Sequence, residues 1–211
     1  MSDSPLNAAP IARARVVLLS GPSGSGKSSL AERSGLPVLQ LDDFYKDGDD
    51  PTLPLLDDGA VDWDSPLAWH RDEALAAIRG LHESGRAEVP VYSIPANGRV
   101  STQVLDLAGA PAFIAEGIFA AEIAGACAAE GLLGDALCLR NGALTTAWRR
   151  LRRDVRESRK SLPVLVRRGW RLMRAERSIV GRQVELGAHP CTGPEADRRI
   201  RAAAGRQLSA V

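Results

Sequence analysis

A glycine-rich loop lies between an apolar run and a helical stretch in Val16–Leu30, VVLLSGPSGSGKSSL. Val16–Ser20 is short and continuously apolar, as in a strand that is buried on both faces. A helix is expected over Ser28–Ser34, where Gly35 and Pro37 end it. A strand, loop and helix in this order indicate a parallel α/β fold with the loop at the carboxyl edge of its sheet.

The loop fits the pattern G-x-x-x-x-G-K-[ST] from Gly21 to Ser28. Glycines let consecutive backbone N–H groups turn toward an anion, and the following helix adds its positive end. Lys27 can bridge the β- and γ-phosphates of a nucleotide, and the Ser28 hydroxyl suits Mg²⁺, which takes oxygen ligands. The alternative is a Gly/Ser turn that binds nothing. The predicted nucleotide-binding residues are Gly21, Ser23, Gly24, Ser25, Gly26, Lys27, Ser28 and Ser29.

Apolar runs alternate with helical stretches along the rest of the chain. Three further buried strands are expected: Pro37–Phe44, 111–119 and Asp135–Asn141. Asp47–Asp64 is expected to be a surface loop and Ala87–Val100 a short extended excursion. The stretch 189–193 is expected to be a plain loop, with a position near the adenine of a nucleotide as the alternative. Helices are expected from Ser65 to Gly80 or Gly85, over Ala120–Glu130, from Thr145 or Thr146 to about Arg177, and from Pro194 onward. The first of these would have Ser65 as N-cap, with Leu67, Leu75 and Ile78 on one face.

This alternation predicts a P-loop-type α/β fold, a doubly wound parallel sheet of about five strands with helices on both faces. We expect one domain over residues 14–211, preceded by a disordered tail at 1–13.

Charge and composition narrow the partner classes. The formal net charge is +1, so the whole chain has no overall attraction to nucleic acid or anionic membranes. The apolar runs are too short to span a bilayer, and the first fifteen residues lack the apolar core of a secretory signal. Cys127, Cys138 and Cys191 have neither metal nor redox spacing, which indicates buried thiols in a reducing compartment. We expect a cytoplasmic protein with a small-molecule partner, and a homo-oligomer is compatible with the sequence.

Acidic residues follow two of the predicted strands. Asp42 and Asp43 end the second strand and Glu116 ends the third, so all three belong at the same sheet edge as the loop. Asp42 can serve as the general base for an attacking hydroxyl, with Asp43 as the rival and a polar strand end as the plain alternative. Glu116 can join Ser28 at the metal by holding a water of the Mg²⁺ shell, or it can be a solvated acid.

Candidates for an acceptor pocket lie in two further segments. Asp62 and Asp64 flank Trp63, and either carboxylate can accept hydrogen bonds from sugar hydroxyls or simply favour the start of a helix. A tyrosine can stack on a base or lie exposed on an edge strand. The segment VPVYSIPANGR contributes Tyr92, Asn97 and Arg99.

A strongly basic stretch follows the fourth predicted strand. Arg149, Arg153 and Arg156 share one helical face by their spacing, and Arg150 lies three residues before Arg153. A helical lid at about 145–177, hinged over the loop, would exclude water and stabilise phosphoryl charge. The alternatives are a solvated basic face or a patch for RNA or anionic lipid. The near-neutral whole and the absence of interleaved aromatics disfavour nucleic acid.

Six motifs occur in a fixed order between Val16 and Lys160: GPSGSGKSSL, LDDFYK, WDSP, VPVYSIPANGR, AEGIF and RRLRRD. In this order the chain resembles the uridine/cytidine kinase family, and more closely its small actinobacterial uridine-kinase-like members. The resemblance implies a five-stranded parallel sheet with an arginine-bearing lid. It also implies ATP and Mg²⁺ as cofactors, with transfer of the γ-phosphoryl group to the 5′-hydroxyl of uridine or cytidine.

The resemblance also assigns roles by motif position. Asp42 matches the catalytic base, Asp64 the carboxylate that holds ribose hydroxyls, and Glu116 the metal-side acid. Tyr45 lies beside the base and Tyr92 matches a pocket tyrosine. The catalytic set is then Asp42, Lys27, Arg150 and Arg153, and the substrate-binding set is Asp42, Tyr45, Asp64, Tyr92, Asn97, Arg99 and Arg153.

Two segments differ from the pattern of that family. Asn97 stands where its members usually carry a histidine, and Glu157–Ser161 departs from the usual lid sequence. Pantothenate, nicotinamide riboside or a sugar phosphate therefore remain alternative acceptors. A nucleotide-binding regulatory module without acceptor activity and an RNA-binding ATPase are the alternatives outside the kinases.

Overall fold

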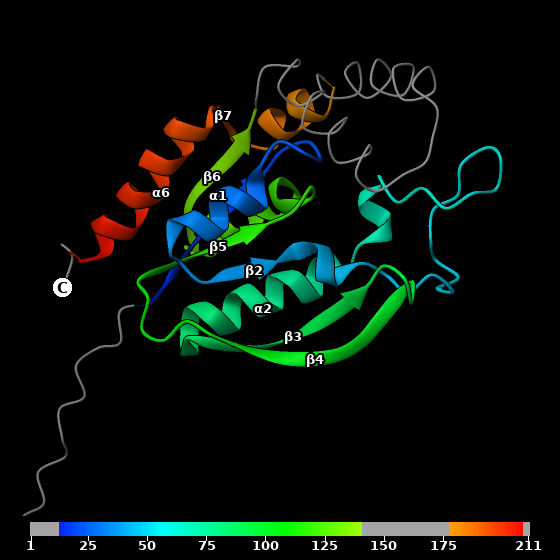
Figure 1. Cartoon of the computed structure of the whole chain (residues 1–211), viewed down its shortest axis with the longest axis horizontal. Coiled ribbons are helices and arrows are strands. Elements are labelled where there is room, and N and C mark those ends of the chain that lie inside the picture. Colours follow the sequence, from blue (N-terminus) through cyan, green and yellow to red (C-terminus); the bar gives the residue numbers. More distant parts are fainter. Residues whose placement is uncertain (1–12, 141–177, 209–211) are drawn as a thin grey trace, which may run out of the picture.

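The computed structural model describes residues 13–140 and 178–208. Its main sheet has five parallel strands in the order β2-β5-β1-β6-β7. The strands are β1 (Arg15–Ser20), β2 (Val38–Gln40), β5 (Ala112–Glu116), β6 (Leu133–Leu139) and β7 (His189–Cys191). The predicted doubly wound parallel sheet is therefore confirmed (Figure 1).

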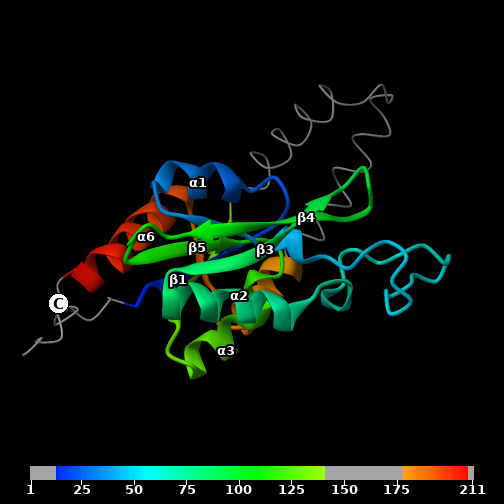
Figure 2. The same ribbon diagram turned by 90° about the horizontal axis from the view of Figure 1, so that it is seen from below.

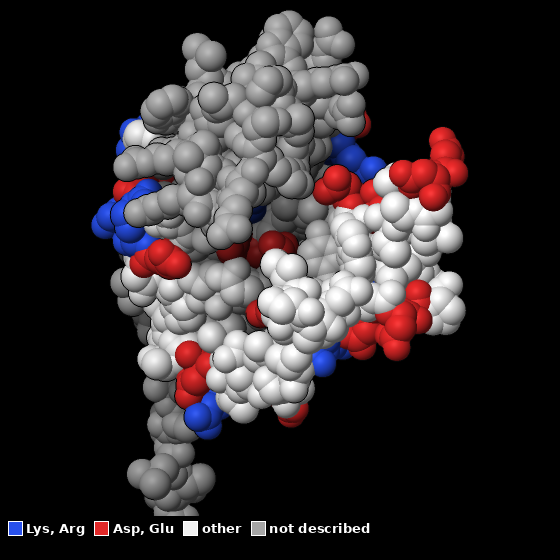
Figure 3. Space-filling view, turned by 45° about the vertical axis from the view of Figure 1, so that its right-hand side comes forward, with Lys and Arg blue, Asp and Glu red and all other residues white. Residues whose placement is uncertain are grey.

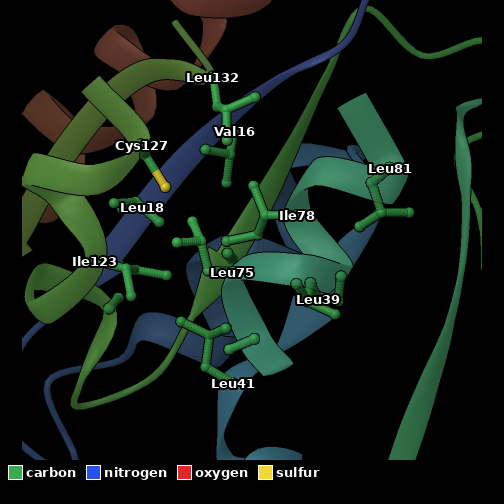
Figure 4. Close-up of a cluster of buried hydrophobic side chains, with 14 of the residues drawn as sticks. Val16, Leu18, Leu39, Leu41, Leu75, Ile78, Leu81, Ile123, Cys127 and Leu132 are labelled. Carbon is green, nitrogen blue, oxygen red and sulfur yellow. The ribbon is translucent and has the colours of Figure 1, made fainter. Parts of the chain in front are cut away.

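Alternate residues of β1 pack against helices on opposite faces of the sheet. Val16 and Leu18 join a core with α2 (Arg71–Ser84) and α3 (Ala124–Ala129), part of which is drawn in Figure 4. Val17 and Leu19 join a second core with α1 (Lys27–Ser34) and α6 (Gly193–Leu208). Figure 2 shows α1 and α6 above the sheet and α2 and α3 below it. This double burial explains why β1 is apolar at every position from Val16 to Leu19.

The second strand is shorter than predicted. β2 ends at Gln40, and the chain continues as the 3₁₀ turn η1 (Leu41–Phe44). Leu41 and Phe44 are both buried, because residues three apart share one side of such a turn. The apolar run thus passes from a strand into a turn, and Asp42 lies within that turn instead of at the tip of a strand.

The helix expected from Ser65 is broken in two. Ser65 does cap a helix, since its hydroxyl accepts from the Leu67 N–H, but that helix is only η2 (Pro66–Ala68). Leu67 is 68% exposed and does not share a core face with α2. Trp69 causes the break, because its buried ring donates its N–H to Leu41 O at 2.8 Å and holds the backbone extended. α2 then ends at Gly85, as one of the two alternatives expected.

An antiparallel hairpin follows α2. β3 (Arg86–Ser93) and β4 (Gly98–Asp106) form a sheet of their own, so the extended excursion is confirmed, although it continues well past Val100. The 189–193 segment was wrongly expected to be a plain loop: it contains β7, which pairs with β6. β7 has three residues and a proline, which is tolerated on an edge strand and hides the strand signal.

Two further predicted helices are present in the structure, and two predicted segments lie outside the described residues. The helix expected over Ala120–Glu130 is confirmed as η3 (Ala120–Ile123) plus α3. The C-terminal helix is confirmed as α6, with Glu195 in its first turn. All three cysteines are free and buried. The expected arginine-rich lid and nearly all of the expected tail lie outside the described residues. Within those residues, no helix is both long and apolar enough to cross a membrane.

Candidate active site

The glycine-rich loop closes tightly between β1 and α1. Gly21, Gly24 and Gly26 have φ angles of 140°, 78° and 93°, which residues with a side chain rarely adopt. A Cβ on Gly21 would lie 2.5 Å from Leu139 O, so the loop can rest against the end of β6 only with glycine there. In this conformation, backbone N–H groups of the loop can point toward an anion bound at the N-terminus of α1.

Lys27 and Ser28 lie at the first turn of α1. The Lys27 side chain is buried and folds back over the loop, with Nζ 2.9 Å from Gly21 O and 3.4 Å from Pro22 O. Ser28 Oγ donates to Glu116 Oε1 at 2.7 Å. The structure therefore brings together the hydroxyl and the carboxylate that the sequence predicted for the metal.

This donor set fits Mg²⁺. Both groups are hard oxygen donors, and Mg²⁺ usually keeps several waters while binding one or two protein ligands and substrate phosphates. The described residues contain no group of three or more His, Cys, Asp or Glu side chains placed to hold a metal alone. A magnesium ion that arrives with the nucleotide suits these residues better than a protein-only metal centre.

Asp42 lies beside this pair. Its carboxylate accepts a hydrogen bond from the Ile118 N–H, just after β5. The approach is close, since a Cβ on Gly117 would lie 3.0 Å from Asp42 Oδ1 and 2.8 Å from Leu41 Cβ. Burial by the surrounding groups raises the pKa of Asp42; the charge of Glu116 acts in the same direction and Lys27 opposes it. By its accessible surface Asp42 is an exposed residue, so the neighbouring groups remove only part of the water around its carboxylate, and solvent can still reach it, as a proton acceptor requires.

Asp43 has a different partner from its neighbour. Its Oδ1 accepts the backbone N–H of Tyr92 at 3.0 Å, which fixes the β3–β4 hairpin to η1. Burial raises the pKa of Asp43, and the hydrogen bond from Tyr92 opposes that shift. Of the two rival acids, Asp42 is thus the one next to Lys27 and Glu116, while Asp43 holds the hairpin.

Aromatic rings surround Tyr45, next to Asp42. The Tyr45 ring lies 5.8 Å from Trp63, 6.1 Å from Tyr92 and 5.8 Å from Phe119, centroid to centroid. Its hydroxyl donates to Trp63 O at 3.2 Å. Burial raises the pKa of Tyr45, and the charges of Asp42 and Asp64 add to the effect. Three predicted acceptor residues, Tyr45, Tyr92 and Asp64, therefore converge near the predicted base.

The hairpin turn is held by its own polar contacts. Asn97 has a φ of 52° and its Oδ1 accepts from the Tyr92 hydroxyl at a long 3.4 Å. Burial raises the pKa of Tyr92, and the negative charge of Asp47 raises it further. Arg99 is tied to α2, because its Nη1 lies 2.7 Å from Glu73 Oε2. Its Nε and Nη2 atoms are buried and find no hydrogen-bond partner among the residues that the structure describes.

A second feature borders the glycine-rich loop on the far side of α1. A cleft of about 580 Å³ lies between α1 and α6. Ser25 and Gly26 are among the residues that line it, so it borders the glycine-rich loop. Its other walls are formed by Leu30, Arg33, Leu139, Gly193, Pro194, Asp197 and Arg201.

Figure 3 shows one face of the molecule, on which acidic side chains lie inside a hollow and along the outer edge of the face.

The structure also adds residues that the sequence did not single out. Gly117 permits the close approach of η1, and its place after Glu116 in AEGIF was the only signal for it. The Asp47 carboxylate accepts the Arg99 N–H at 2.7 Å and so ties the acidic loop to the hairpin. Gln183 contacts Ile118 O from a distant helix, and no motif marks it. Arg150 and Arg153 lie outside the described residues, so their predicted roles stay predictions.

The fold and the glycine-rich loop define the class, a P-loop kinase-type α/β protein. Solved structures of other proteins share this fold, and two of them illustrate the similarity. A Silicibacter sp. TM1040 protein described as a fructose transport system kinase matches with a TM-score of 0.58 and 17% identity, over 83% of this chain and 87% of that one. Phosphoribulokinase from Rhodobacter spheroides matches with a TM-score of 0.52 and 14% identity, over 85% and 70%.

In sequence the chain is uridine-kinase-like. The uridine kinase of Schizosaccharomyces pombe is 32% identical over 126 residues, which is 56% of this chain and 28% of that protein. The uridine kinase of Saccharomyces cerevisiae is 32% identical over 50% of this chain and 22% of that protein. A Bacillus cereus uridine kinase is 26% identical over 72% of each chain. The match thus spans only about a quarter of each yeast relative, and no protein-family model matches the chain.

Proposed function

We propose that the protein is an ATP-dependent kinase that phosphorylates a hydroxyl of a small molecule, and that the acceptor is the 5′-hydroxyl of uridine or cytidine. The observation that carries the proposal is the position of Asp42. It lies close enough to Lys27 and Glu116 for both charges to act on its pKa, which is where an acceptor hydroxyl would meet a terminal phosphate.

The phosphate side has a distinct task for each group. The loop amides and Lys27 bind the phosphates, and Ser28 with Glu116 would hold Mg²⁺. When bound, the metal neutralises negative charge on the transferring group. Asp42 accepts the proton of the attacking hydroxyl as its oxygen bonds to phosphorus and the bond from phosphorus to the leaving ADP oxygen breaks. The raised pKa of Asp42 makes it a better proton acceptor than an ordinary aspartate.

The acceptor side suits a nucleoside. Tyr92, packed beside Tyr45, offers an aromatic ring for a planar base, while Asp64 offers a carboxylate for ribose hydroxyls. The similarity to uridine kinases supports this choice over a sugar phosphate. Arg150 and Arg153 would neutralise phosphoryl charge from the predicted lid.

The cleft between α1 and α6 would take the base of ATP. It opens directly beside the phosphate-binding loop, at Ser25 and Gly26. Leu30 and Pro194 provide apolar surface for a ring, and Asp197 provides an acceptor for an amino group.

The test is release of ADP by the purified protein with a panel of acceptors: uridine, cytidine, adenosine, nicotinamide riboside, pantothenate and ribulose 5-phosphate. Turnover stimulated by uridine or cytidine, with the phosphorylated product identified by mass, is the expected result. Turnover with another acceptor alone would retain the kinase and discard the pyrimidine nucleoside. Tight ATP binding without stimulation by any acceptor would favour a regulatory module, and hydrolysis stimulated by RNA would favour an ATPase.

A further inference from the structure

Gln183 is a buried amide with both ends hydrogen-bonded. It lies on the helix at residues 178–185 and is only 4% exposed. Its Nε2 donates to Ile118 O at 3.0 Å, and its Oε1 accepts from Cys138 Sγ at 3.0 Å. Cys138 is near the end of β6 and Ile118 follows β5, with β1 between these strands. The Gln183 amide therefore links the end of β6 to the turn after β5 at the carboxyl edge of the sheet.

Ile118 is held at two backbone atoms. Its carbonyl oxygen accepts from Gln183, and its N–H donates to the carboxylate of Asp42. The preceding residue, Gly117, donates its N–H to Leu19 O at 3.2 Å and has no side chain to separate the turn from η1. The turn at 117–118 thus links Gln183 to the predicted base.

We propose that Gln183 is a positioning residue: by holding the 117–118 turn, it keeps Asp42 in place in front of the phosphate-binding loop. The inference rests on the proposed kinase function, in which Asp42 takes the proton. A side chain that donates to Ile118 O and accepts from the Cys138 thiol at once needs both a donor and an acceptor, as the amide of glutamine has. A buried carbonyl left without its donor costs enough to displace a short turn.

The neighbouring residue offers a matched control. Arg182 lies on the same helix and pairs with Glu122 Oε1 through Nε at 3.0 Å and Nη2 at 2.9 Å. This ion pair is at the surface and makes no bond to the 117–118 turn. Arg182→Gln therefore weakens the attachment of the helix without touching the contact that the proposal invokes.

The experiment compares Gln183→Met with Arg182→Gln in the full chain by two measurements. In steady-state kinetics Gln183→Met should lower kcat about 10- to 100-fold, the scale of a small misplacement of a reacting group, and leave the KM for ATP nearly unchanged. In ¹H–¹⁵N NMR the Ile118 amide should shift upfield and exchange about tenfold faster or more. Arg182→Gln should change neither.

Three results would overturn the proposal: a normal kcat in Gln183→Met, a lower kcat with an unchanged Ile118 amide, or equal effects in Arg182→Gln. If the methionine variant does not fold, Gln183→Glu gives the same comparison, because it keeps the shape and loses the donor to Ile118. A wild-type protein that turns over no acceptor would remove the proposed function. The Ile118 amide would still show whether Gln183 holds the turn.

Discussion

The two sides of the site are built in different ways. Apart from Glu116, the phosphate side is one continuous stretch, 21–28, whose shape comes from glycines with positive φ and from contacts within a few residues, such as Lys27 to Gly21. The acceptor side is assembled from separate segments joined by side chains that bond distant backbone. Asp43 reaches Tyr92 and Asp47 reaches Arg99, about fifty positions along the chain.

This difference teaches how one fold can keep its chemistry and change its substrate. A local, glycine-defined loop tolerates almost no variation, since a Cβ on Gly21 meets the backbone of β6. The hairpin and the acidic loop are more exposed and depend on a few hydrogen bonds, so their residues can change without disturbing the sheet. Asp42 lies between the two sides. Variants of this residue should therefore distinguish the role of the phosphate side from that of the acceptor side most clearly.

The largest effect is expected for Asp42→Asn. Loss of the general base should lower kcat about 10²–10⁴-fold with little change in ATP affinity. Asp43→Ala is the control from the other side of the comparison: it removes the acceptor of the Tyr92 N–H that anchors the hairpin, so it should mainly raise the KM for the acceptor. Steady-state kinetics of both variants decide the point, and equal losses of kcat would make the two acids indistinguishable in role.

The pH dependence of Asp42 follows from its raised pKa. The folded protein keeps this proton at a pH where the unfolded chain has lost it. The contribution of Asp42 to the free energy of unfolding therefore falls as the pH rises from the ordinary aspartate pKa through the raised one. Activity should rise across the same interval, since the base must be ionised. Asp42→Asn should consequently melt no lower than wild type at neutral pH, and a clear drop in Tm would contradict this account.

Lys27→Met comes next in size. Removing a preorganised positive donor from a phosphate site typically costs about 10²–10³-fold, and here the loss should appear in kcat/KM for ATP. Lys46→Met is the control, because the Lys46 ammonium lies at the surface and bonds Thr52 Oγ1. Nucleotide binding by calorimetry would complement the kinetics. Full ATP affinity and turnover in Lys27→Met would remove Lys27 from the phosphate side.

The contrast between the two sides also explains what the sequence could predict. The strand, loop and helix at 15–34 followed from residue type and order alone, because their contacts are local. Glu116 was singled out because it ends a buried strand, and the structure brings it within hydrogen-bond distance of Ser28; its role at a metal stays a prediction. The sheet followed from the alternation of apolar runs with helices.

Other parts depended on contacts that no local pattern encodes. The run PVLQLDDF looks like one strand, yet Leu41 and Phe44 are buried through a turn that Trp69 helps to hold. β7 was hidden by Pro190 and its short length. The different duties of Asp42 and Asp43 depend on Ile118 and Tyr92, which are distant in sequence. Long-range hydrogen bonds of this kind set the acceptor side, so its details required the structure.

Gly117→Ala should have a smaller effect that links the two sides. The new Cβ would lie 2.8 Å from Leu41 Cβ and 3.0 Å from Asp42 Oδ1, so η1 must move. We expect a loss of about 1–3 kcal/mol in the free energy of unfolding and a drop in kcat of about tenfold. Gly125→Ala is the control, since a Cβ there meets nothing within 4 Å and alanine favours the helix. Denaturant unfolding and kinetics of both variants test the close approach.

The smallest effect is expected for Tyr92→Phe. The ring, which packs 6.1 Å from Tyr45, is kept, and only the long hydrogen bond from the hydroxyl to Asn97 Oδ1 is lost. A bond of this length is worth at most about 1 kcal/mol, so the KM for the acceptor should rise no more than about fivefold while kcat is unchanged. Tyr92→Ala, which removes the ring, should raise that KM further. If the phenylalanine variant loses as much as the alanine variant, then the hydroxyl contacts the acceptor directly and the pocket recognises a polar group of the base instead of its flat face.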